Sequence, residues 1–275
     1  MAGVRAALLG AGRGVRMKAG VPKTLTPISG DNPLLHFILT GLEAAGITNL
    51  LVVTGFKPGP LQSYVNEHWN GEATFIFNAR YASWGNFHSA RLAVDQSPQS
   101  DLLIVNSDIV VHPDVFRRAA AAPGDLVLAV QDRDDLTEED MRVQLGAGAA
   151  APRDRGGAGS AGAQGRRVVA IGKDIPMAQS HGEFCGVSLL RPAAARAFAE
   201  VATDLQWQAR TSLYYEDIYA QALDGLDARA VGVAPEEYAE VDRPEDLAGA
   251  AAVVEAHPGA WQAAGEPTTD QTAAP

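Results

Sequence analysis

The chain has 275 residues, of which 33 are acidic and 22 are Lys or Arg, so its formal net charge at pH 7 is −11. This balance argues against nucleic acid or anionic membranes as the main partner, because such polyanions favour broad basic surfaces. The length suits one α/β domain of generous size, and a single cysteine excludes an internal disulfide.

The chain also lacks the apolar runs that membrane insertion requires. No stretch approaches the roughly twenty apolar residues of a membrane span. The run over 4–9 is too short, before its glycines, for a signal peptide. We therefore expect a cytoplasmic protein.

Apolar runs alternate with helical patterns in the first half of the chain. The patterns predict strands over 4–9, 49–54, 73–77 and 101–108, and helices over 33–46, 60–69 and 87–95. Short, nearly all-apolar strands between helices indicate a parallel sheet that is covered on both faces. Ligands of such sheets bind beyond the carboxyl ends of the strands, which here places four loops on one rim, those after Leu9, Thr54, Phe77 and Asn106.

The second half is less regular. We expect strands over 125–131, 141–145, 166–172 and 183–190, and helices over 192–203, 212–223 and 244–256. Residues 146–165 hold fourteen glycines and alanines in twenty positions, and we interpret them as a flexible hairpin insertion because strands flank them closely. We expect a single domain over 1–258 and a disordered tail over 259–275.

A glycine-rich segment, "GAGRGVRMKAGVPK", follows the first strand. It is no dinucleotide fingerprint, because the third glycine of G-x-G-x-x-G would fall on Val15 or Met17, and no Gly-Lys-Ser/Thr follows to make a P-loop. Its glycines let backbone N–H groups approach an anion, and basic side chains add charge, which suits a triphosphate. An ordinary loop with solvated bases is the alternative. Four basic residues lie within eleven positions: Arg13, Arg16, Lys18 and Lys23.

Seven segments, collinear over residues 4–250, carry a family resemblance: "LGAGRGVRM" with "PK", "LLVVTGF", "FNARYASWGNFHSARLA", "IVNSD", "FCGVSLL", "LYYEDIY" and "EVDRPEDL". They resemble the signatures of the nucleotidyltransferase family of sugar-nucleotide and cytidylyl transferases, and the last four are most similar to those of bacterial phosphocholine and phosphonate cytidylyltransferases. The resemblance implies a Rossmann-like, mostly parallel central sheet with helices on both faces and a β-rich acceptor-binding part. Departures are Gly10 for alanine, Val15 for serine or threonine, and the Gly/Ala insertion.

The resemblance also implies a nucleotide site. Arg16 and Lys23 would be the catalytic charge partners of the nucleotide, stabilising the negative charge of an in-line attack. Asn86 and Ser89 could instead cap the helix over 87–95. The implied nucleotide-binding residues are Leu9, Gly10, Ala11, Gly12, Arg13, Gly14, Thr54, Asn78, Asn86 and Ser89.

Three acids form the expected metal site. Asp108 ends an apolar strand at the ligand rim, and Glu240 and Asp242, two apart, point to the same side of an extended segment. The family resemblance implies that together they hold Mg²⁺ through oxygen ligands. The alternatives are local, since Asp108 could cap a helix or turn and Asp242 could help start the helix after "RPEDL".

The acceptor pocket is expected to combine aromatic faces with carboxylates. Such a set would hold an ammonium group through cation–π contacts and charge pairing, while Lys173 could reach a phosphate or phosphonate. The alternative is plain helix packing for the aromatic rings, and a solvated lysine. The expected acceptor-binding residues are Lys173, Tyr215, Glu216, Asp217 and Trp84.

The sequence thus favours a Mg²⁺-dependent nucleotidyltransferase that transfers CMP from CTP to a small phosphate or phosphonate acceptor and releases pyrophosphate. One alternative keeps the fold and uses a sugar or cyclitol 1-phosphate with another nucleoside triphosphate. Another is a nucleotide-binding module without turnover. A homo-oligomer is compatible with the sequence, and neither nucleic acid nor a membrane is expected as a partner.

Overall fold

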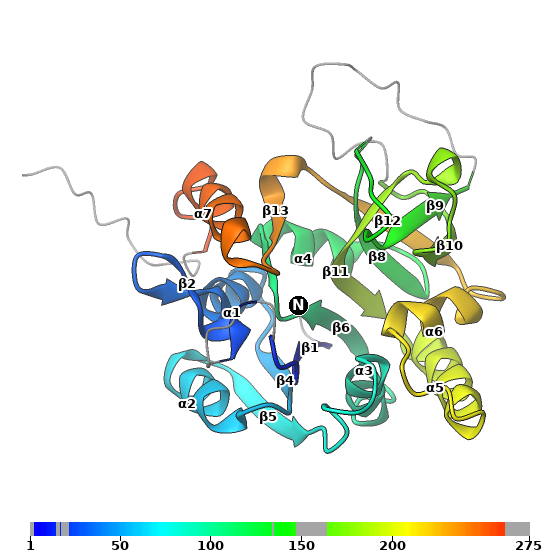
Figure 1. Cartoon of the computed structure of the whole chain (residues 1–275), viewed down its shortest axis with the longest axis horizontal. Coiled ribbons are helices and arrows are strands. Elements are labelled where there is room, and N and C mark those ends of the chain that lie inside the picture. Colours follow the sequence, from blue (N-terminus) through cyan, green and yellow to red (C-terminus); the bar gives the residue numbers. More distant parts are fainter. Residues whose placement is uncertain (1–2, 15–16, 18–21, 134, 147–163, 262–275) are drawn as a thin grey trace, which may run out of the picture.

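A nine-stranded sheet runs through the centre of this computed structural model, which describes residues 3–14, 17, 22–133, 135–146 and 164–261 (Figure 1). One half of the sheet is parallel, with strands in the order β6-β1-β4-β5. Their carboxyl ends therefore lie along one edge, as expected from the sequence. These strands are β1 (Val4–Gly10), β4 (Asn49–Thr54), β5 (Glu72–Phe77) and β6 (Asp101–Asn106).

The other half of the sheet is mixed. The long strand β11 (Gly182–Leu190) runs antiparallel to β6 and joins the two halves. On the edge away from β6 it pairs with β8 (Leu126–Gln131), and its first two residues, on the other edge, pair with β9 (Arg142–Leu145). Strand β12 (Ala228–Val233) pairs with β8 in parallel. Strand β10 (Val168–Gly172) pairs with β9 in antiparallel orientation.

Two short antiparallel pairs lie outside this sheet. The first joins β2 (Pro27–Ser29) to β3 (Asn32–Pro33). The second joins β7 (Ile109–Val111), directly after Asp108, to β13 (Tyr238–Glu240). The second pair thus brings together two segments that lie more than a hundred residues apart in the sequence.

Helices cover both faces of the sheet. Alternate residues of β1 divide between two hydrophobic clusters, Ala6 and Leu8 in one and Ala7 and Leu9 in the other. The first cluster receives α1 (Leu34–Ala44), α2 (Pro58–His68), α4 (Pro113–Ala121) and α7 (Leu247–Ala256). The second receives α3 (Phe87–Asp95), α5 (Pro192–Trp207) and α6 (Tyr215–Ala222). This arrangement confirms the expected fold class.

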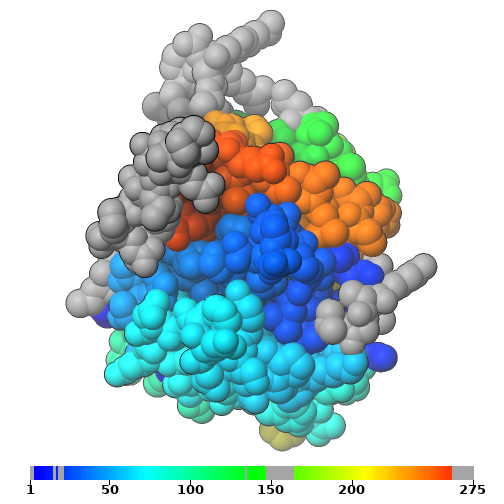
Figure 2. Space-filling model, turned by 90° about the vertical axis from the view of Figure 1, so that its left-hand side faces the viewer, coloured from blue at the N-terminus to red at the C-terminus, as the bar shows by residue number. Residues whose placement is uncertain are grey.

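Four one-turn 3₁₀ helices complete the elements within the described ranges, and α7, near the C-terminal end of these ranges, packs against β2. In Figure 2 the orange-to-red segment that contains α7 lies on the blue N-terminal segment around β2. No helix in the described ranges is long and apolar enough to cross a membrane. The 3₁₀ helices are η2 (Lys23–Leu25), η3 (Met177–Gln179), η4 (Pro235–Glu237) and η5 (Pro244–Asp246).

The strands and helices expected from the sequence are present with shifts of a few residues at their ends, but β2, β3, β7, α4, β12 and β13 were not predicted. Strands of three residues are too short to show a periodic pattern. The strands that flank the Gly/Ala-rich segment, β9 and β10, pair with each other as a hairpin would. Most of that segment, 147–163, and most of the expected tail, 262–275, lie outside the described residues.

Candidate active site

The glycine loop after β1 lies against Lys23. Gly14 has a φ of +55°, and a Cβ built on it would lie 2.8 Å from the Cβ of Lys23. A side chain at residue 14 would therefore be both strained and in collision with that lysine. Gly12 and Arg13 are exposed, and the Arg13 guanidinium lies 5.9 Å from the centre of the Phe56 ring. Of the other expected loop residues, Leu9, Gly10 and Ala11 are buried, and Arg16 lies outside the described residues.

The polar residues expected at the nucleotide rim are tied to the protein itself. The fully buried Thr54 donates its hydroxyl to the Ile76 carbonyl at 3.2 Å. Asn78 and Ser89 are also buried, and Asn78 Nδ2 lies 2.9 Å from Ser89 Oγ. These three side chains brace the ends of β4, β5 and α3 against one another, and their contact with a nucleotide stays a prediction.

Asn86 has a structural task that the sequence did not reveal. It stands at the N-cap of α3, yet its side chain makes no capping bond there. Its Oδ1 instead accepts the Tyr215 backbone N–H of α6 at 2.9 Å. The expectation that Asn86 could cap its own helix is therefore wrong, and the residue joins two helices whose N-termini face the same rim.

The three expected metal ligands converge. Antiparallel pairing sets Ile109 of β7 opposite Glu240 of β13, and the Val241 N–H donates to the Asp108 carbonyl at 2.7 Å. One carboxylate oxygen from each of Asp108, Glu240 and Asp242 lies within 4.8 Å of the others. The sequence predicted this set, and the pairing of β7 with β13 is what brings its members together.

Lys23 lies against two of these acids. Its Nζ is 3.2 Å from Asp108 Oδ2 and 2.6 Å from Asp242 Oδ1. Burial opposes the charged lysine, but the two carboxylates outweigh it and raise the pKa of Lys23 above its ordinary value. The cluster therefore holds a permanent cation beside the acids.

The acid cluster fits a divalent cation. Asp108 Oδ1 is buried and has no hydrogen-bond partner among the described residues. Glu240 is exposed as a residue, yet partial desolvation of its carboxylate and the charges of Asp108 and Asp242 raise its pKa to about 8. Closely spaced carboxylates with an unsatisfied oxygen form the all-oxygen donor set that Mg²⁺ and similar hard cations prefer. Asp108, Glu240 and Asp242 would hold such an ion.

A cavity of about 280 Å³ adjoins the acids and includes Glu240 and Asp242 in its wall. Arg133 also lines it, with Nη1 2.7 Å from Glu183 Oε2. Burial, followed by the charge of Asp140, raises the pKa of Glu183 above its ordinary value. Sequence reasoning missed these residues. Glu183 and Gln131, polar residues at the ends of apolar strands and paired in register, were the signal that could have found them.

A larger cavity of about 520 Å³ lies between β10 and α6 and contains two of the residues expected to bind the acceptor, Lys173 and Asp217. Lys173 Nζ lies 5.6 Å from the centre of the Tyr214 ring and 3.4 Å from Glu139 Oε2. Asp217 Oδ2 accepts the Tyr214 backbone N–H at 2.7 Å, so it also caps α6.

The other expected acceptor residues are mostly enclosed. Tyr215 is fully buried, and its hydroxyl donates to Asn106 Oδ1 at 2.9 Å. Glu216 is 5% exposed, and its Oε2 has no hydrogen-bond partner within the described part of the chain. Burial, helped by the charges of Asp217 and Asp108, raises the pKa of Glu216 to about 8. Trp84 stacks on Phe87, so the five residues do not share one open pocket.

Comparisons with known proteins agree with this fold. The CTP:phosphocholine cytidylyltransferase LicC from Streptococcus pneumoniae has a TM-score of 0.69 at 18% identity, covering 89% of this chain and 96% of its own. The inositol-1-phosphate CTP transferase from T. maritima has a TM-score of 0.69 at 17% identity, covering 91% of this chain and 95% of its own. At such identities the likeness concerns the fold.

Two curated relatives match by sequence. The CMP-5'-(3-aminopropyl)phosphonate synthase of Streptomyces rubellomurinus is 34% identical over 124 residues, which are 44% of this chain and 19% of that protein. The bifunctional protein GlmU of Xanthobacter autotrophicus is 26% identical over 257 residues, which are 90% of this chain and 52% of that protein. The chain thus spans between about a fifth and about half the length of these relatives.

A family model places the chain more firmly. The MobA-like NTP transferase domain matches residues 6–211, a range that includes the glycine loop, Lys23, Asp108 and Glu183. The match covers most of the chain and ends before β12, β13 and the acids Glu240 and Asp242. The protein is therefore a member of the nucleotidyltransferase family defined by the MobA-like NTP transferase domain.

Proposed function

We propose that the protein is a Mg²⁺-dependent nucleotidyltransferase that transfers CMP from CTP to a small phosphate or phosphonate acceptor and releases pyrophosphate. The observation that carries this proposal is the convergence of Asp108, Glu240 and Asp242 around an unsatisfied carboxylate oxygen, with Lys23 in contact. Paired acids and a fixed cation at the carboxyl edge of a parallel sheet suit a triphosphate and its metal ion.

The proposed reaction is an in-line displacement. An acceptor oxygen forms a bond to the α-phosphorus of CTP, the bond from that phosphorus to the bridging oxygen breaks, and its electron pair leaves with pyrophosphate. A phosphate-type acceptor is largely dianionic at pH 7, so no protein group has to remove a proton. Lys23, and in the proposal Arg16, stabilise the negative charge that develops. Bound Mg²⁺ would supply further charge neutralisation at the same phosphates.

The 280 Å³ cavity is our proposed place for the acceptor. The acceptor phosphate has to reach the acid cluster, and this cavity shares Glu240 and Asp242 with it. Arg133 can receive a phosphate or phosphonate, and Glu183 and Asp140 favour a cationic group at the other end of the acceptor. An aminoalkyl phosphonate or a phosphocholine-like molecule combines these two features. The name of the Streptomyces rubellomurinus relative also contains an aminoalkyl phosphonate.

A sugar 1-phosphate with another nucleoside triphosphate is the second candidate. Its support is the alignment with GlmU, which extends over 90% of this chain. The two candidates differ in the charge of the acceptor, because a sugar brings hydroxyl groups and no cation to Glu183 and Asp140.

A panel of nucleoside triphosphates and acceptors, assayed by pyrophosphate release, separates the candidates. We expect CTP with an ammonium-bearing phosphonate or phosphate to give the highest kcat/KM. Asp108→Ala should then remove pyrophosphate release, whereas Asp204→Asn, a change at an exposed acid on α5, should leave it unchanged. Unchanged release by Asp108→Ala with the best acceptor contradicts the proposal.

Glu183 provides a separate test of the acceptor's charge. We expect Glu183→Gln to weaken an ammonium-bearing acceptor more than an uncharged acceptor of similar size, because Glu183 lines the proposed acceptor cavity and only the first acceptor brings a cation to it. Equal losses with both acceptors would show that Glu183 does not recognise the cation.

A further inference from the structure

Strands β7 and β13 form a ribbon with two unlike ends. Asp108 and Glu240 lie at one end, where the Val241 N–H donates to the Asp108 carbonyl. At the other end the His112 N–H donates to the Glu237 carbonyl at 2.8 Å. Each strand has only three residues, so about 10 Å separates the two ends.

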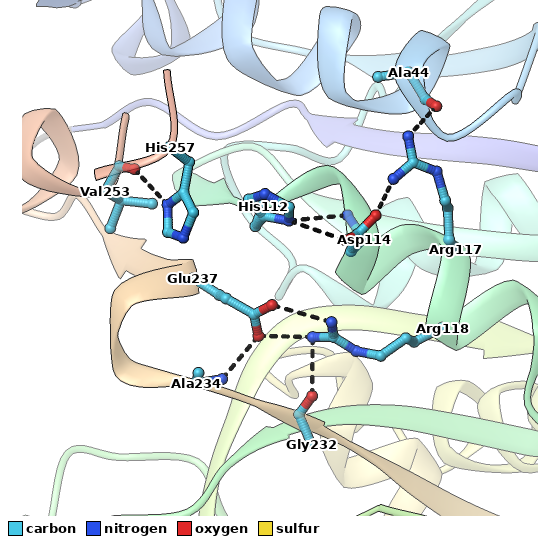
Figure 3. Close-up of polar contacts among 10 residues, drawn as sticks. All are labelled: Ala44, His112, Asp114, Arg117, Arg118, Gly232, Ala234, Glu237, Val253 and His257. Atoms are coloured by element: carbon cyan, nitrogen blue, oxygen red, sulfur yellow. Dashed lines mark hydrogen bonds and ion pairs between the residues drawn. The ribbon is translucent and has the colours of Figure 1, made fainter. Parts of the chain in front are cut away.

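An ion pair fastens the end that is remote from the acids (Figure 3). Arg118 of α4 donates from Nη1 to Glu237 Oε1 at 3.0 Å and from Nη2 to Glu237 Oε2 at 2.7 Å. Nη2 also donates to the Gly232 carbonyl of β12 at 3.1 Å. Such a two-pronged contact fixes the carboxylate in both position and orientation.

Glu237 is ionised in this arrangement. Burial opposes its charge, but the hydrogen bonds from Arg118 and from the Ala234 N–H, at 2.9 Å, outweigh burial and hold the pKa of Glu237 below its ordinary value. Both side chains are largely shielded from water, with 28% of the Arg118 and 14% of the Glu237 side chain exposed. The pair is therefore screened less than a surface ion pair.

Helix α4 connects this pair to the rigid part of the molecule. Val115, Phe116 and Ala119 of α4 are buried in the cluster that covers one face of the central sheet. The neighbouring Arg117 also binds the Ala44 carbonyl of α1. An isolated two-stranded ribbon is marginally stable at best, so the position of β7 and β13 depends on such external fastening.

We propose that Arg118 and Glu237 are a positioning pair that sets the separation between Asp108 and the two acids at the end of β13, and thereby the affinity of the site for a divalent cation. The inference rests on the proposed function only in that it takes the acid cluster as the metal site. Loss of the pair frees the remote end of the ribbon, and the carboxylates then meet the cation in less favourable positions. Partners of this kind, which orient metal ligands, typically contribute 10–100-fold to metal affinity.

The test is a titration of the nucleotide-free protein with Mn²⁺. Binding of the ion is measured by electron paramagnetic resonance, at a temperature well below the melting temperature of each variant. We expect Glu237→Gln and Arg118→Met each to weaken Mn²⁺ binding about tenfold. The double variant should bind no more weakly than either single one, because the two residues act as one unit. Glu236→Gln, at the exposed neighbour in η4, is a matched control that should keep the wild-type affinity.

The outcomes separate the two proposals. Wild-type affinity in folded Glu237→Gln and Arg118→Met, within twofold, overturns the positioning role, and so does an equal loss in Glu236→Gln. If these variants do not fold, Arg118→Lys is tested in their place, because it keeps the positive charge but loses the two-pronged contact. Unchanged Mn²⁺ affinity of Arg118→Lys overturns the inference. If the wild type binds no Mn²⁺, or Asp108→Asn binds it as well as the wild type does, the metal site of the proposed function falls instead.

Discussion

The buried carboxyl group of Glu216 should make the protein less stable as the pH rises. A single substitution at this position should remove that part of the pH dependence. Its pKa is raised from 4.5 to about 8, chiefly by burial. Between these two pH values the folded protein holds a proton that the unfolded chain has released. The free energy of unfolding therefore falls as the pH rises through this window, and the stabilisation is complete only below pH 4.5.

The size of the effect follows from the shift. Each pKa unit corresponds to about 1.4 kcal/mol, so the change from pH 5.5 to pH 8.5 amounts to about 3 kcal/mol for this one group. For a chain of this size that corresponds to a shift in melting temperature of roughly 6–12 °C. A glutamine in place of Glu216 does not ionise and should remove this part of the pH dependence.

The assay is thermal and urea unfolding of the wild type and Glu216→Gln at several pH values from 5.5 to 8.5, in the presence of a chelator. Glu240 titrates in both proteins and cancels in the difference between them. Glu200→Gln, at an exposed position of α5, is the control and should keep the wild-type slope. Equal slopes for the wild type and Glu216→Gln would refute the reasoning, because they would mean that Glu216 ionises as readily in the folded protein as in the unfolded chain.

Three further changes test other parts of the structure. Gly186→Ala should lower the free energy of unfolding, measured with urea, by about 1–3 kcal/mol. The reason is that Gly186 has a φ of +71° and that a Cβ there would lie 2.8 Å from a side-chain nitrogen. The control Gly59→Ala, with open space around it, should leave the stability unchanged or raise it. Arg133→Met should raise the KM for the acceptor about tenfold or more and leave the KM for CTP nearly unchanged. A larger increase in the KM for the acceptor from Lys173→Met would indicate that the acceptor binds in the 520 Å³ cavity instead. Lys23→Met should lower kcat by about 10²–10³-fold in pyrophosphate release, and a loss below tenfold would contradict its role.

Part of the candidate site was predictable because its members belong to short, contiguous motifs. Asp108 comes two residues after the end of an apolar strand, and Glu240 and Asp242 share one side of an extended segment, so local patterns sufficed to single them out. The glycine loop and Lys23 lie within one segment for the same reason. Parallel strands then had to bring their carboxyl ends to one edge, which is a general property of such sheets.

Other parts depend on contacts between distant segments, which no local pattern reports. Arg133 meets Glu183, fifty residues away, and Arg118 meets Glu237 across 119 residues. Asn86 illustrates the difference well, since its place before α3 predicts a cap for that helix while its side chain binds α6. A capping residue can serve any helix N-terminus within reach, and only the packing of α3 beside α6 decides which.

The amino-acid sequence by itself determined the alternation of strands and helices, the parallel half of the sheet and the acids of the candidate metal site, because burial periodicity and short motifs are local properties. The tertiary structure alone decided that β7 pairs with β13, that Tyr215 and Glu216 are enclosed, and that a cavity with Arg133 and Glu183 adjoins the acids. These features arise when strands distant in sequence pair and side chains compete for the same interior. Their energies depend on neighbours that the chain acquires only on folding.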